Sequence, residues 1–321
     1  AYRAPWTNRV LTLPYLRQGW THLRVSTELF RHPPRAYWVP GHEVPLWPGK
    51  ASIITTIHDV VFRTIPESYS PAACLRQELA VRHAVRHAEQ IITVSEATKG
   101  DLINYYGAQS ERISVTPLAA DRLPPVTPTE VARARAELGL GEGRVILFVG
   151  RVERKKGCDR LLRAFDLLSQ RPGFEDVRLV LAGGLSADMA PALAEAQSRP
   201  SFARVVLPGF VSDETRSALY HLATILAFPT RGEGFGLPVL EAMQVGLPVI
   251  ASDLPVIREV AEVAAQYVRG DDLQAWVEIM GSYLNEGNLR QTLVTAGLSQ
   301  AQKFSWRLTA EKTASVLRAY V

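Results

Sequence analysis

One stretch of the C-terminal half has the residue types and spacing that hold a phosphorylated sugar. In PTRGEGFGLPVLEAMQVGLPVI (229–250), three glycines follow a predicted strand, and Pro238 lies in the first turn of a predicted helix. Free N–H groups and the positive dipole end make such a helix start favourable for phosphate. Glu233, in the loop, and Glu241, placed in the first helical turn, would accept hydrogen bonds from sugar hydroxyls. The alternative, acids that only complement the helix dipole, is weaker because Gly-Phe-Gly and both glutamates occur together.

A second stretch, VGRVERKKGCDRLL (149–162), places basic residues after another predicted strand. Arg151 and Lys156 follow Gly150 and are suited to clamping a diphosphate. The same run holds Arg154 and Lys155, and a solvated charge run is an equally good interpretation by itself. Its position at the carboxyl end of a strand, where parallel sheets bind ligands, favours the clamp.

The histidines and cysteines provide weaker evidence for a functional site. His58 follows the predicted strand 52–57, where it would face a ligand or bond nearby backbone as an ordinary turn residue. His83 and His87 share a helix face without a third ligand, and Cys74 and Cys158 are far apart in sequence, so we expect no metal site. Two cysteines also indicate a reducing compartment.

The elements that must position these residues alternate between strand and helix. Such alternation predicts parallel sheets covered on both faces. In the first half we expect a loop over 37–50, helices over 71–88 and from the N-cap Ser95 to Tyr106, and strands over 52–57, 91–94 and 112–117. In the second half we expect helices over 158–169 and 213–222 and strands over 144–150, 177–184, 203–210, 223–229 and 248–253.

Length and composition bound the organisation. The 321 residues suggest two domains, and the proline-rich stretch 117–130 is the predicted linker. We place an N-terminal domain at 1–125, a C-terminal domain at 126–304 and a final helix, capped by Ser305, at 305–321. The net charge of +4 suits anionic ligands, but no nucleic-acid motif accompanies it. The chain opens on Ala1, so we expect an N-terminal piece to be missing.

GR-x4-KG (150–157) and E-G-F-G-L-P-x-x-E (233–241) resemble the retaining glycosyltransferases of family 4, and most of all their bacterial mannosyltransferase branch. The resemblance covers about 52–321 and includes TIHDVVF (56–62) and ITVSEATKGDL (92–102). It implies the GT-B fold: two Rossmann-like domains facing across a cleft, with the last helix crossing back to the first domain. The family's N-terminal glycine-rich loop is not found here, which again indicates truncation.

The resemblance also implies roles. Catalytic residues would be Arg151, Lys156, Glu233 and His58, the first two on the donor diphosphate. Donor-binding residues would be Gly150, Val211, Phe235, Gly236, Leu237 and Glu241, with Val211 at the nucleobase and Glu241 on the ribose. Ser95 would lie on the acceptor side.

The expected activity is transfer of a hexose, mannose from GDP-mannose, to a glycan or lipid-linked acceptor with retention of configuration. No cofactor is expected, since there is no Asp-x-Asp motif for a metal. We expect a cytoplasmic enzyme, without nucleic-acid partners, that touches anionic lipids through Arg76, Arg82 and Arg86. The alternatives are a nucleotide-sugar 2-epimerase of the same fold and a non-catalytic module that binds nucleotide sugars.

Overall fold

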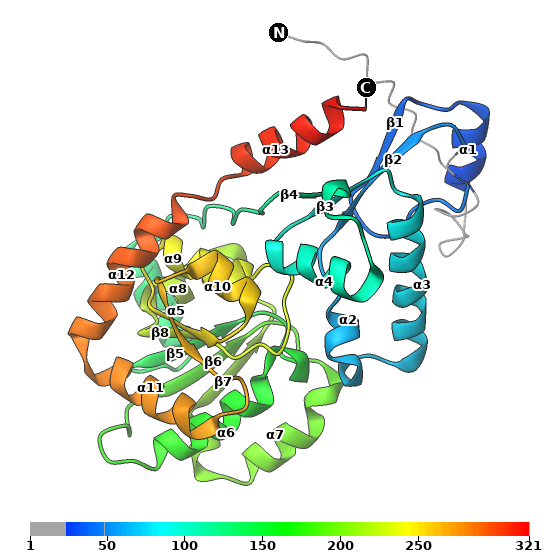
Figure 1. Cartoon of the computed structure of the whole chain (residues 1–321). Coiled ribbons are helices and arrows are strands. Elements are labelled where there is room, and N and C mark those ends of the chain that lie inside the picture. The colour runs from blue at the N-terminus through cyan, green and yellow to red at the C-terminus, as the bar shows by residue number, and fades with distance from the viewer. Residues whose placement is uncertain (1–23, 48, 321) are drawn as a thin grey trace.

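The computed structural model describes residues 24–47 and 49–320, and these form two α/β domains side by side (Figure 1). The N-terminal domain has a parallel sheet in the order β1-β2-β3-β4. Its strands are β1 (Ala36–Val39), β2 (Ser52–Ile57), β3 (Gln90–Thr93) and β4 (Ile113–Val115). Its helices are α1 (Ser26–Arg31), α2 (Val61–Thr64), α3 (Pro71–His87) and α4 (Glu96–Tyr106), with 3-10 turns at Pro66–Ser68 and Ser110–Arg112.

The C-terminal domain has a six-stranded parallel sheet in the order β10-β9-β8-β5-β6-β7, the order of a Rossmann fold. Its strands are β5 (Val145–Val149), β6 (Arg178–Ala182), β7 (Val205–Gly209), β8 (Ile225–Phe228), β9 (Val249–Ser252) and β10 (Ala265–Val268). Its helices are α5 (Pro128–Glu137), α6 (Cys158–Ser169), α7 (Ala190–Gln197), α8 (Asp213–Leu222), α9 (Leu237–Gln244), α10 (Pro255–Ala261), α11 (Leu273–Asn285) and α12 (Gly287–Ala301). Short 3-10 turns occupy Arg154–Lys156, Ala187–Met189 and Pro200–Arg204.

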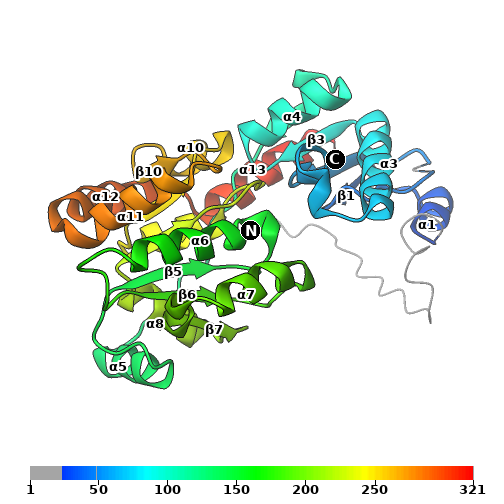
Figure 2. The ribbon, with the colours of Figure 1, turned by 90° about the horizontal axis from the view of Figure 1, so that it is seen from below.

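Helices cover both faces of this second sheet, which is why its central strands are continuously apolar. Helix α6 packs with α7 and α11, while α8 packs with α5, and α9 with α12. Figure 2 shows α5 and α8 on one side of the strands and α6 on the other. The fold is therefore the one that the alternating pattern predicts.

Local signals located several helices well. Helices α6 and α8 have the predicted bounds, and α4 begins after Ser95, whose Oγ accepts from Thr98 N at 3.1 Å. Helix α4 ends at Gly107, which adopts φ 64°. The loop predicted over 37–50 is wrong at its start, because β1 lies there and pairs with β2, Ala36 opposite Ser52. The β-forming Tyr-Trp-Val before Pro40 extends once β2 supplies a partner.

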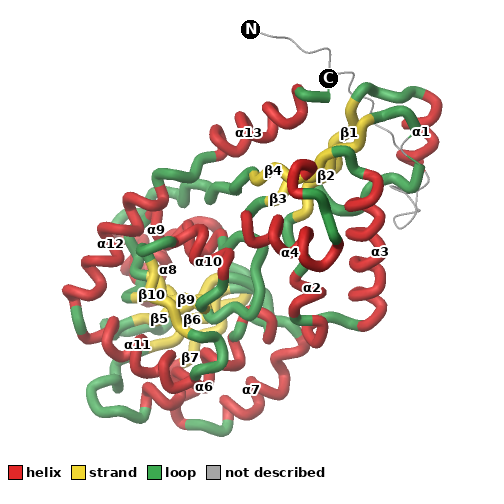
Figure 3. The backbone as a smooth tube through the Cα atoms, in the orientation of Figure 1, coloured by secondary structure: helices red, strands yellow, loops and turns green. Residues whose placement is uncertain are grey.

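Two connections join the domains, and Figure 3 shows the first as loop and the second as a short loop followed by a helix. Residues 116–127 run from β4 to α5 without helix or strand. This segment is nevertheless held to the C-terminal domain, because Ser217 Oγ donates to Pro124 O at 2.6 Å. After α12 the chain returns as α13 (Trp306–Arg318), where Thr309 Oγ1 donates to Pro117 O at 2.7 Å. Tyr320 Oη contacts Gln90 Oε1 of the N-terminal domain at 3.1 Å. The last helix thus crosses back to the first domain as predicted.

Within the described ranges, none of the helices combines the length and apolar character needed to cross a membrane.

Candidate functional site

A pocket of about 290 Å³ lies where the two domains face each other. It is at the carboxyl ends of β2, β3, β5 and β8, the edge at which parallel sheets bind ligands. Seven residues predicted from the sequence line it: His58, Gly150, Lys156, Glu233, Phe235, Gly236 and Leu237. Asp59 also lines the pocket, and its Oδ1 accepts from Val61 N at 3.0 Å. Asp59 was not selected from the sequence, where its only signal was its position next to His58.

The glycine loop before α9 is shaped by close contacts. Gly236 is the N-cap of α9 with φ 101°, a conformation that favours glycine, and a Cβ there would lie 2.7 Å from Ile257 Cδ1. Pro238 is the second residue of the helix and needs no N–H partner. Helix α9 therefore begins at the pocket, which Gly236, Leu237 and Pro238 line, and it has no side-chain cap.

Lys156 and Glu233 form an ion pair in this pocket, with Nζ and Oε1 2.5 Å apart. Their side chains are only 19% and 12% exposed, so the pair is mostly shielded from water. Lys156 reaches the loop because Gly157, with φ 73°, lets the preceding turn pack on the Pro229 carbonyl, where a Cβ would overlap. The lysine of GR-x4-KG therefore depends on the glycine that follows it.

The rest of the basic run separates in three directions. Arg151 is 67% exposed, pairs with Glu153 at 3.6 Å and is not among the residues lining the described pocket. Lys155 Nζ donates to the Tyr69 hydroxyl of the N-terminal domain at 3.2 Å. Arg154 points toward Asp159, 4.0 Å away. Of the four cations in the run, only Lys156 lines the pocket as the structure describes it.

Glu241 is the fifth residue of α9, so it lies in the second turn rather than the first as expected. Its side chain is buried, its Oε2 accepts from the Tyr220 hydroxyl at 2.7 Å, and Arg216 lies 3.4 Å from Oε1. Burial raises the pKa of the Glu241 carboxyl, although the Tyr220 bond opposes that shift. Sequence reasoning missed both partners, whose i, i+4 spacing on α8 was the available signal.

Two further predicted residues, Val211 and Ser95, are not among the residues that line this pocket. Val211 follows β7, packs against the C-terminal core and is not among the pocket-lining residues of the described chain. Ser95 is fully buried, with its Oγ 3.0 Å from Gly234 O across the domain boundary. Its hydroxyl thus joins the domains beside the pocket, which Gly234 lines, and the acceptor-side role of Ser95 stays a prediction.

His58 is among the residues that line the pocket, and its Nε2 lies 3.3 Å from Pro40 O. Its role toward a ligand stays a prediction.

The described part of the chain contains no group of three His, Cys, Asp or Glu side chains that could hold a metal ion. The prediction of metal-free chemistry stays a prediction.

Comparisons with known proteins agree with this geometry. The family described as "Glycosyl transferases group 1" matches residues 143–286, and "Glycosyltransferase Family 4" matches residues 8–122. The chain is 29% identical over 301 residues to the O-antigen chain mannosyltransferase B of Escherichia coli, covering 92% of this chain and 76% of that protein. It is 31% identical over 290 residues to the D-inositol 3-phosphate glycosyltransferase of Nocardia farcinica, covering 86% of this chain and 63% of the relative.

Solved structures share the architecture. The Anabaena protein HepE in complex with UDP and glucose superposes with a TM-score of 0.71 at 23% identity, covering 84% of this chain and 72% of that one. A glycosyltransferase from Rickettsia africae superposes with a TM-score of 0.72 at 16% identity, covering 92% and 79%. These likenesses show the fold. The chain spans less than two thirds of the length of the inositol-phosphate relatives.

Proposed function

Because the chain belongs to the family 4 glycosyltransferases with the GT-B fold, we propose that it transfers a hexose from a nucleotide-diphosphate sugar to a glycan or lipid-linked acceptor. The observation that carries the proposal is the pocket in which Lys156, Glu233 and the start of α9 converge. Similarity to an O-antigen chain mannosyltransferase favours mannose, carried by GDP, as the sugar. We also propose retention of configuration, and only the family resemblance supports it.

In this proposal the donor diphosphate lies at the start of α9 and on Lys156 Nζ. The phosphate takes over the lysine from Glu233, whose carboxylate then accepts from hydroxyls of the transferred sugar. Arg151 reaches the diphosphate by leaving Glu153, and Glu241 holds the ribose. As the bond from the anomeric carbon to the diphosphate oxygen breaks, negative charge grows where the lysine and the helix start already stand. The acceptor oxygen forms the new bond to the anomeric carbon, and its proton passes to the departing diphosphate oxygen.

The acceptor side belongs to the N-terminal domain. Its helix α3 exposes Leu75 and Leu79 beside three arginines, and a face of that composition suits an anionic lipid surface. The enzyme would contact the proposed lipid-linked acceptor at this face of α3. Co-sedimentation with vesicles containing phosphatidylglycerol, compared with neutral vesicles, tests this contact; equal partitioning contradicts it.

A panel of GDP and UDP sugars tests the central proposal. We expect calorimetric binding in EDTA as strong as in magnesium, followed by transfer to an added glycan acceptor. NMR should show an α-linked product from the α-linked donor. Binding only with a divalent metal contradicts the metal-free donor site, and a β-linked product contradicts retention. Release of a 2-epimer without acceptor indicates the epimerase, and binding without any turnover the non-catalytic module.

A further inference from the structure

The amino end of α4 lies where the two domains meet. Helix α10 of the C-terminal domain packs beside it, as Figures 1 and 2 both show. The Glu259 carboxylate accepts from the backbone N–H groups of Glu96 at 2.8 Å and Ala97 at 3.2 Å. A carboxylate on two N–H groups at a helix start is a strong, charge-assisted contact. One side chain of the donor domain therefore caps a helix of the other domain.

The next residues of that helix hold both halves of the pocket. Ser95 Oγ, fully buried, lies 3.0 Å from Gly234 O in the glycine loop. Thr98 Oγ1 donates to His58 O at 3.2 Å, at the end of β2. A single helix turn thus touches the donor loop and the strand end that carries His58.

The glycine loop, residues 232–236, packs tightly against the N-terminal domain. A Cβ on Gly234 would lie 2.4 Å from His58 O, and one on Gly232 would lie 2.7 Å from Val61 Cγ1. Real Cβ atoms essentially never make such short contacts, so the loop backbone lies directly against the His58 carbonyl and the Val61 side chain. Its conformation therefore depends on how closely the domains approach.

We propose that Glu259, Ser95 and Thr98 form a latch, the α4 latch, that holds the closed domain arrangement and positions loop 232–236 against His58. These are positioning residues, because they act through the loop and the strand end rather than on substrate. The latch sets the rate of transfer, whereas the donor is bound by groups of the C-terminal domain. The kinetic part of this inference rests on the proposed function.

Glu259→Ala tests the latch. We expect a larger radius of gyration in small-angle X-ray scattering, because the α4 start loses its partner in the other domain. We expect kcat for transfer to fall roughly tenfold or more, the scale of a lost hydrogen bond to a charged group, with the Kd for GDP changed by less than about twofold. Glu259→Gln keeps an accepting oxygen and should recover part of both properties.

Arg258→Ala is the matched control, since Arg258 lies on the same helix but pairs with Asp253 of its own domain at 2.5 Å. It should leave the radius of gyration and kcat near those of the wild type. Ser95→Gly is the second variant: glycine is tolerated as an N-cap, so the helix survives while the contact with Gly234 is lost. It too should lower kcat while sparing GDP binding.

Unchanged scattering in Glu259→Ala overturns the latch, whatever happens to the rate. A loss of GDP affinity as large as the loss of kcat also overturns it, because the residues would then be general supports of the donor site. The scattering arm needs no activity. If the wild type transferred no sugar, the proposed function would be contradicted. The comparison of radii of gyration between Glu259→Ala and the wild type would still test the latch.

Discussion

At the scale of single residues, the central feature is that Lys156 is already neutralised by Glu233. Both side chains are mostly buried, so each supports the other until a ligand arrives. A donor phosphate therefore exchanges one anionic partner of the lysine for another, which limits the cost of keeping a cation in the pocket.

Lys156→Ala should lower transfer by about a hundredfold, since it removes a preorganised charge aimed at the leaving diphosphate. It should also lower the free energy of unfolding by about 1 kcal/mol, because Glu233 is left without its cation. The double variant Lys156→Ala/Glu233→Gln should recover the stability but not the rate. Transfer kinetics and urea denaturation measure the two effects.

Arg154→Ala serves as control, because it removes an exposed charge from the same turn. Lys155→Ala would not serve, since Lys155 contacts Tyr69 across the domain boundary. Recovery of transfer in the double variant would mean that Lys156 only balances Glu233.

At the scale of elements, loop 232–236 transmits domain contact to the donor site. Gly234→Ala should destabilise the protein by about 1–3 kcal/mol and lower transfer, because the added Cβ meets the His58 carbonyl. Gly100→Ala, within α4 and with open space around its Cβ position, should be neutral or stabilising by up to ~1 kcal/mol. Thermal unfolding and transfer assays compare them. Equal stability and transfer in the two variants would contradict the prediction, because the loop would then have room for a Cβ at Gly234.

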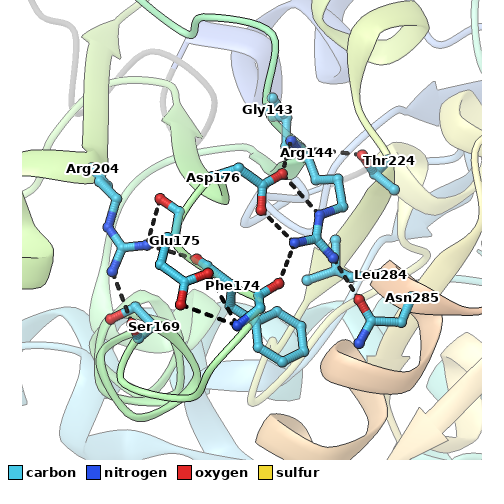
Figure 4. Close-up of polar contacts among 12 residues, drawn as sticks. Gly143, Arg144, Ser169, Phe174, Glu175, Asp176, Arg204, Thr224, Leu284 and Asn285 are labelled. Atoms are coloured by element: carbon cyan, nitrogen blue, oxygen red, sulfur yellow. Dashed lines mark hydrogen bonds and ion pairs between the residues drawn. The ribbon is translucent and has the colours of Figure 1, made fainter.

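The amino end of the second sheet is secured by a polar network (Figure 4). Arg144, just before β5, donates through Nε to Asp176 Oδ2 at 2.9 Å and through Nη1 to Asn285 Oδ1 at 2.5 Å. Arg204 ties the same turn to α6 by donating to Phe174 O at 2.7 Å and Ser169 O at 3.0 Å. This end of β5 is opposite to the pocket, so the network serves the fold and not the chemistry.

Asp176→Asn should therefore change stability without changing GDP binding. The hydrogen bond from Arg144 lowers the pKa of Asp176 to about 2. Because the folded-state pKa is depressed, the stabilisation is present above the unfolded pKa of about 4 and is lost as pH falls toward 2. The side chain is 44% exposed, so solvent screening reduces the effect to about 1 kcal/mol at neutral pH.

Urea denaturation at several pH values between about 7 and 3 should show the gap between Asp176→Asn and wild type narrowing as pH falls. Glu137→Gln, in an exposed pair with Arg133, should show little gap at any pH. A gap that widens on acidification would contradict the assigned role of Arg144.

At the scale of the whole molecule, the proposed donor and acceptor functions belong to different domains. Glu241→Gln, which keeps an acceptor for the Tyr220 hydroxyl, should weaken GDP binding, because a carboxylate accepts from ribose hydroxyls more strongly than an amide does. His58→Ala should leave GDP binding near wild type and reduce transfer. Calorimetry and single-turnover kinetics separate the two, and loss of GDP binding in His58→Ala would contradict this division.

Local features of this protein could be predicted from its amino-acid sequence. Hydrophobic periodicity and caps located α4, α6 and α8, and glycine and proline placed the loop that enters α9. These signals work because a helix and its caps are fixed by residues within a few positions of one another. Strand β1 was not predicted, because a short edge strand forms only when the neighbouring strand, here β2, is present to pair with it.

The packing of the two domains determines which residues of each sequence pattern come into contact. Arg151, Arg154, Lys155 and Lys156 are equivalent in a charge run, and the left-handed turn at Gly157 packed on Pro229 selects the last of them for the pocket. Ser95 meets Gly234 across 139 residues of sequence, and Glu259 meets the start of α4 across 163. Such contacts depend on how two separately folded sheets are brought together, and no spacing within either segment encodes that distance.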